Sequence, residues 1–126
     1  MTALFAQDAV AMGEMLARGE ISSAALVKAH LERADAVDGS LNAFVHRFDE
    51  EALAAAADAD AARSKGEPVG PLHGIPITIK ESIATAGVAS TLGIRNRQSH
   101  PQTADAVIVQ LLRDAGAIVL GKTNIP

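Results

Sequence analysis

Two short apolar segments with a helix between them limit the fold that this chain can adopt. The first, Ile75 to Ile79, follows a turn rich in glycine and proline, and the second runs from Ala117 to Leu120. Thr103 is expected to cap the intervening helix, which is predicted over residues 104–115 and closed by Gly116. Strand, helix and strand in this order are typical of two parallel strands joined by a crossover. The pattern predicts an α/β fold.

Three more helices are predicted before the first strand, each beginning at a residue whose side chain can cap it. The expected caps are Asp8, Ser22 or Ser23, and Asp49. The second helix is expected to end near residues 37–39 and the third near Lys65, with residues 41–45 as an apolar connector. Residues 1–69 therefore read as covering helices, and residues 70–126 as strand, loop, helix and strand.

The helix over residues 104–115 should bury a stripe of apolar side chains. These are Val107, Leu111 and Leu112, with Ile108 beside them. The segment from Glu81 to Gln102 before this helix is long and polar, which is typical of functional or poorly ordered loops. Two strands are too few for a parallel sheet buried on both faces, so we expect the chain to be the N-terminal part of a larger domain.

Composition excludes several classes of function. The net charge is −4, and the only aromatic residues are three Phe, which argues against nucleic-acid binding. There is no Cys for a disulfide, a thiolate zinc site or a nucleophile, and the four His lack metal-ligand spacing. No window is apolar enough to span a membrane. We expect a cytoplasmic protein without metal or organic cofactor and without nucleic-acid or membrane partners.

Residues Gly116 to Thr123 match the phosphate-loop pattern GxxxxGKT, which would make the chain a nucleotide-binding module. A phosphate loop, however, requires a strand, then a loop of free amides, then a helix. Here the order is helix, glycine, strand, and the residues between the two glycines are apolar. We therefore interpret the match as accidental.

Lys80 is the residue with the most chemical interest, because it ends the first apolar strand. Alternation places Pro76, Thr78 and Lys80 on one face and the three isoleucines of the strand on the other. An ordinary exposed lysine and a buried base are both compatible with this position. A lysine acts as a base only in its neutral form, which burial favours.

The runs GPLHGIPITIKES, TAGVASTLG and DAVIVQLLRDAGAIVLGKTNIP resemble the amidase signature family, as does GEISSAALVKAHLERADAVDGSLNAFV nearer the N-terminus. Members of that family hydrolyse the C–N bond of carboxylic amides. The resemblance implies a mixed β-sheet between helical layers, of which residues 1–126 are the incomplete N-terminal portion. It implies a small-molecule amide as substrate.

The resemblance also implies a catalytic triad of a serine nucleophile, a second serine with a cis peptide, and a lysine. The lysine of the motif matches Lys80, which is therefore expected to be the base. Both serines belong to a glycine- and serine-rich stretch beyond residue 126, and the serines at 82, 90 and 99 have no such context. Lys122 is expected to be structural or on the surface, and His73 to be polar packing. Thr91, Thr123 and Asn124 are hypothesised to line the site.

Three readings stay open from the sequence. The first is an amidase of which this chain is a part that is inactive alone. The second is a non-catalytic fragment or subunit of such an enzyme, or alternatively a part like the A subunit of an aminoacyl-tRNA amidotransferase. In either case the chain could pair with itself or with the missing C-terminal portion. The third, disfavoured above, is the nucleotide-binding module.

Overall fold

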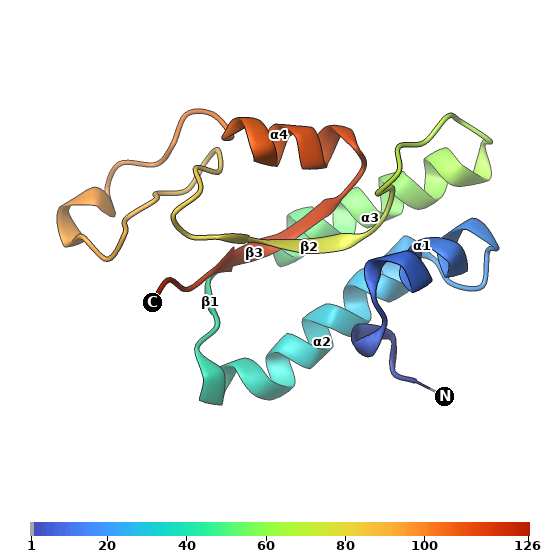
Figure 1. Cartoon of the computed structure of the whole chain (residues 1–126), viewed down its shortest axis with the longest axis horizontal. Coiled ribbons are helices and arrows are strands. Elements are labelled where there is room, and N and C mark those ends of the chain that lie inside the picture. The colour runs from blue at the N-terminus through green and yellow to red at the C-terminus, as the bar shows by residue number, and fades with distance from the viewer. Residues whose placement is uncertain (1) are drawn as a thin grey trace.

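The computed structural model describes residues 2–126. The chain folds into a three-stranded mixed sheet with helices on both sides (Figure 1). The α-helices are α1 (Ala9–Ala17), α2 (Ser23–Leu41), α3 (Asp49–Ser64) and α4 (Val107–Asp114). Two short 3₁₀ helices are η1 (Leu4–Ala6) and η2 (Arg95–Arg97). The strands are β1 (Phe44–Arg47), β2 (Pro76–Lys80) and β3 (Ile118–Thr123). No helix within the described range is long and apolar enough to cross a membrane.

The sheet has the strand order β1-β3-β2. Strand β3 pairs in parallel with β2, which confirms the predicted α/β fold and the parallel pair. Strand β1 pairs antiparallel with β3 and was not expected, because the sequence pattern indicated a connector over residues 41–45. The strand is short, and its burial does not alternate, so it lacks the periodicity by which strands are recognised. The three strands together make the sheet mixed.

Helices cover the two faces of β3 because neighbouring side chains of a strand point in opposite directions. Ile118 and Leu120 pack against α2 and α3, whereas Val119 packs with Ile79 and with Val109 of α4. Figure 1 shows α4 on one side of the sheet and α2 on the other. This layering leaves the C-terminal ends of β2 and β3 side by side at one edge, where Lys80 lies.

Two of the predicted N-caps are confirmed. The carboxylate of Asp8 accepts a hydrogen bond from the amide of Ala11 (2.8 Å), and the hydroxyl of Ser22 accepts one from Ala25 (3.1 Å). The cap predicted at Asp49 is wrong: α3 is preceded by Phe48, and the Asp49 carboxylate binds Arg47 instead.

Two helix boundaries also differ from the prediction. Helix α2 continues past residues 37–39 to Leu41, and it is closed by Asn42, whose φ of 53° is left-handed. Helix α4 begins at Val107 rather than at residue 104, and Thr103 does not cap it. The reason lies in Asp105, whose carboxylate accepts a hydrogen bond from Ala86 (2.8 Å) and pairs with Arg113 (3.1 Å). These contacts attach the residues directly before α4 to the loop that follows β2, so they do not join the helix.

The predicted buried stripe of α4 is wrong as well. Its fully buried residue is Val109, and Leu112 is half-buried against the same cluster. The other predicted members are exposed, with exposed fractions of 78% for Val107, 50% for Ile108 and 58% for Leu111. Helix α4 thus presents an apolar face away from the sheet of the described residues.

Candidate active site

Lys80 is the last residue of β2 and lies beside Thr123 of β3. Ile79 is buried against α4, so alternation directs Lys80 to the opposite face of the sheet. There its side chain is exposed, as is that of Thr78. Within the described part of the chain, the structure therefore presents Lys80 as an accessible amine at the C-terminal edge of the sheet.

Glu81, the next residue, is buried, with only 4% of its surface exposed. Its carboxylate accepts hydrogen bonds from the amides of Thr91 and Leu92, the latter at 3.1 Å. Burial raises the pKa of this carboxyl, but the hydrogen bonds from Thr91 and Leu92 and the charge of Lys122 outweigh burial. The net pKa of Glu81 lies below its ordinary value, so the group is a carboxylate at neutral pH.

Lys122 of β3 is completely buried, which rules out the surface position that the sequence left open for it. Its ammonium donates a hydrogen bond to the hydroxyl of Ser90 (2.9 Å). Burial lowers the pKa of Lys122, and the negative charge of Glu81 partly offsets this effect. Glu81 and Lys122 thus hold neighbouring residues of the same loop, an arrangement that the sequence pattern did not predict.

A signal for this cluster was present in the sequence. Parallel strands end at the same edge of a sheet, so charged residues at the ends of β2 and β3 must lie close together. The predicted second strand stopped at Leu120, two residues before Lys122, so this lysine was not placed in the sheet.

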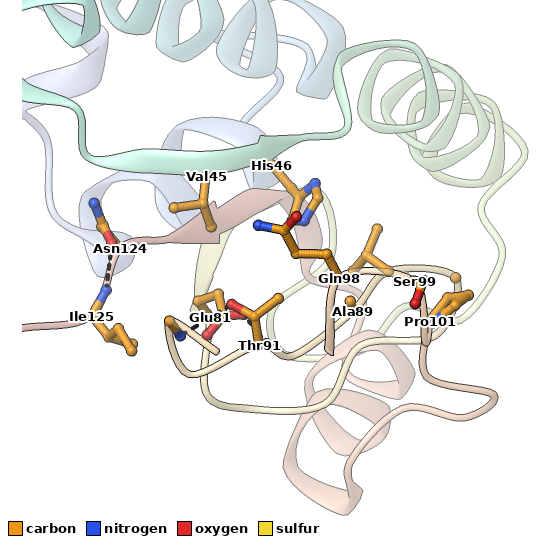
Figure 2. A pocket seen from close by; sticks show the side chains of 13 residues that line it. Val45, His46, Glu81, Ala89, Thr91, Gln98, Ser99, Pro101, Asn124 and Ile125 are labelled. Atoms are coloured by element: carbon orange, nitrogen blue, oxygen red, sulfur yellow. Dashed lines mark hydrogen bonds between the residues drawn. The ribbon is translucent and has the colours of Figure 1, made fainter. Parts of the chain in front are cut away.

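A cavity of about 690 Å³ opens beside Glu81 at this edge. Figure 2 shows Val45 and His46 on one side of it, and Thr91, Gln98 and Ser99 of the long loop on the other. Thr91 and Asn124, two of the three residues hypothesised to line the site, are among its lining residues, whereas Thr123 is not. The cavity combines apolar walls with hydroxyl, amide and imidazole groups, so it could accommodate a small polar organic molecule.

The glycines of the phosphate-loop pattern are explained by close packing. A side chain on Gly116, which has a φ of 98°, would come within 2.6 Å of the Cα of His73, and one on Gly121 would collide with the carbonyl oxygen of His46. Residues Ile118–Thr123 form β3, so the segment is a strand and offers no phosphate-binding loop. His73 is packing, as expected, because its Nε2 lies 2.8 Å from the carbonyl oxygen of Ala59.

Comparisons with known proteins agree with the sequence motifs. The family model for amidases matches residues 25–126. The chain is 44% identical over 124 residues to the A subunit of the glutamyl-tRNA(Gln) amidotransferase of Salinispora arenicola, covering 98% of this chain and 25% of that protein. It is 43% identical over 119 residues to the indoleacetamide hydrolase of Bradyrhizobium diazoefficiens, covering 94% of this chain and 23% of that protein. The chain therefore spans about a quarter of the length of the curated relatives it matches.

Solved structures give the same result. The peptide amidase of Stenotrophomonas maltophilia matches with a TM-score of 0.87 and 38% identity, over 95% of this chain and 25% of that one. A bacterial aryl acylamidase of the amidase signature family matches with a TM-score of 0.89 and 30% identity, over 95% and 25% of the two chains. Sequence, family model and fold agree, and the chain belongs to the amidase signature family.

Proposed function

We propose that residues 1–126 are the lysine-bearing N-terminal portion of an amidase that hydrolyses the C–N bond of small carboxylic amides, and that Lys80 is its general base. The observation that carries the proposal is the position of Lys80. The residue matches the lysine of the family motif, and it stands exposed at the C-terminal edge of a parallel strand pair, where ligands of α/β sheets bind.

In the proposed mechanism, neutral Lys80 takes a proton from a bridging serine, which in turn takes one from a nucleophilic serine. The nucleophile attacks the amide carbonyl, ammonia or an amine leaves with a proton, and water hydrolyses the resulting acyl-enzyme. Both serines would come from the glycine- and serine-rich segment of the family, outside these 126 residues. The rest of the domain would also cover Lys80, and this loss of water favours the neutral amine that the mechanism needs.

The test is the Lys80→Ala variant in a protein where residues 1–126 are joined to the serine-bearing segment. We expect ammonia release from simple amides to fall about 10²–10⁴-fold, because proton transfer by a positioned base contributes about that much. The Lys28→Ala variant is the matched control, since Lys28 lies exposed on α2 away from the sheet edge. The 126-residue chain alone should release no ammonia. Near-normal turnover by Lys80→Ala would remove Lys80 from the mechanism.

A second candidate is amide-nitrogen transfer as part of a glutamyl-tRNA(Gln) amidotransferase, which the 44% identity to one component of such an enzyme favours. The two candidates share the role of Lys80 and differ in the acceptor of the nitrogen. An assay of the longer protein separates them. Hydrolysis of an aryl or alkyl amide without any partner supports the amidase, whereas amidation of glutamyl-tRNA(Gln) only in the presence of partner proteins supports the transferase.

A further inference from the structure

Glu81 and Lys122 together bind three consecutive residues of the long loop after β2. The Glu81 carboxylate holds the amides of Thr91 and Leu92, and the Lys122 ammonium holds the hydroxyl of Ser90. Both charged side chains are buried, with exposed fractions of 4% and 0%. Burying two opposite charges is costly, so buried ionic groups are weak evidence for a gain in stability. Their contacts point instead to a role in fixing the position of what they hold.

Glu81 and Lys122 lie next to Lys80 at the end of the strand pair. Ile79 and Lys80 of β2 are the register partners of Lys122 and Thr123 of β3. Directly after Lys80, the amide of Glu81 donates a hydrogen bond to the carbonyl oxygen of Thr123 (2.8 Å). The amide of Ile83 then bonds to the carbonyl oxygen of Lys80 (2.9 Å). These backbone hydrogen bonds join Lys80 to the start of the loop whose residues 90–92 the two side chains bind.

The bound loop adopts a strained conformation where Glu81 holds it. Leu92 has a φ of 51°, which is unfavourable for a residue with a branched side chain. Its amide donates one of the two hydrogen bonds that the Glu81 carboxylate accepts (3.1 Å). Strained residues persist where the surrounding structure fixes them, and they occur often at functional sites. The loop also contributes Thr91 and Gly93 to the wall of the cavity beside Glu81.

We propose that Glu81 and Lys122 are positioning residues of this amidase, which tie residues 90–92 to the ends of β2 and β3 and thereby fix the backbone of Lys80. The inference rests on the proposed function, because it concerns the base of that reaction. Glu81 and Lys122 act through Lys80 and the loop, and neither needs to touch the substrate.

The experiment compares Glu81→Gln with Lys80→Ala in the protein that carries the serine-bearing segment. Glutamine has nearly the same shape as glutamate. Its side-chain NH₂ group, however, would face a backbone N–H and could not accept a hydrogen bond from it. We expect kcat to fall about ten- to a hundredfold with KM little changed, since small displacements of catalytic groups have effects of that size. We expect Glu81→Asp, which keeps both acceptor oxygens, to restore part of the loss. The control is Glu67→Gln, an exposed glutamate outside the sheet, which should leave kcat unchanged.

Hydrogen–deuterium exchange of the peptide over residues 89–94 provides a readout that does not depend on activity. Glu81→Gln and Lys122→Met should each speed exchange there, and Glu67→Gln should not. Unchanged exchange, an unchanged kcat, or a loss confined to KM in Glu81→Gln would each overturn the inference. An impaired Lys80→Ala beside a normal Glu81→Gln overturns only this inference. A normal Lys80→Ala overturns the proposed function and the positioning role together, and leaves any exchange effect as a structural property.

Discussion

The Gly116 backbone shows how one residue can decide the meaning of a motif. In a phosphate loop, glycine lets an anion approach the backbone. Here, Gly116 lets the backbone of His73 approach instead. The amide of Gly74 donates a hydrogen bond to the carbonyl oxygen of Gly116 (3.0 Å), and the Cα of His73 occupies the space where a Cβ would stand. The turn that leads into β2 is thereby fastened to the start of β3. The glycine is required by packing between the two parallel strands.

This packing predicts the effect of alanine at Gly116. The Gly116→Ala variant suffers both from its φ of 98° and from overlap with the backbone of His73. Gly87→Ala is the matched control, because Gly87 has a φ of 88° but open space where a Cβ would stand. Left-handed strain alone costs about 1–2 kcal/mol, and overlap with a packed neighbour adds about 1–3 kcal/mol. Urea unfolding should therefore show a clearly larger loss for Gly116→Ala. Equal losses of unfolding free energy in the two variants would mean that the backbone near His73 moves aside without an energetic cost.

For helices and strands, the sequence predicts the structure correctly where a single side chain determines it. Asp8 and Ser22 cap their helices because the capping bond reaches only three residues along the chain. The errors arose where distant residues decide. Strand β1 is stabilised by its pairing with β3, more than 70 residues later in the chain. Asp105 lies outside α4 because its carboxylate binds Ala86 and Arg113. The burial of Glu81 and Lys122 likewise depends on the loop that contains residues 90–92, and no local sequence pattern predicts the conformation of this loop.

One tertiary contact between elements is a cap supplied by a different helix. The carboxylate of Asp60 in α3 accepts hydrogen bonds from the first amides of α2, Ser23 (2.7 Å) and Ala24 (3.0 Å). These amides would otherwise lack partners within the helix. A negative charge at this end of a helix is also favourable. Asp60 therefore both caps α2 and fixes it against α3.

We expect Asp60→Ala to lower the free energy of unfolding by about 2 kcal/mol, because two amides lose their acceptor. Asp58→Ala, at an exposed position of the same helix, should change it by less than about 0.5 kcal/mol. Both variants gain the same helix propensity, so the difference between their urea denaturation curves measures the cap. A difference near zero would show that water replaces Asp60 at the start of α2.

The described sheet has two unpaired edges, and α4 has an uncovered face. Strands β1 and β2 are the outer strands, and Val107, Ile108 and Leu111 are exposed on α4. The family relatives are about four times longer than this chain, so their domains contain further segments that could cover such surfaces. Exposed strand edges and apolar patches promote association between chains.

We therefore expect the 126-residue chain to self-associate through the exposed face of α4. The variant with Ile108→Glu and Leu111→Glu should reduce this association, because each added charge would have to lose its water in the contact. Its helix content should stay the same, since at least half of each residue's surface is already exposed. Val10→Glu is the matched control: Val10 is 71% exposed, but it lies on α1. Sedimentation velocity over a range of concentrations measures the effect. A wild-type chain that remains a monodisperse monomer, or equal dissociation by Val10→Glu, would show that α4 is not the contact surface.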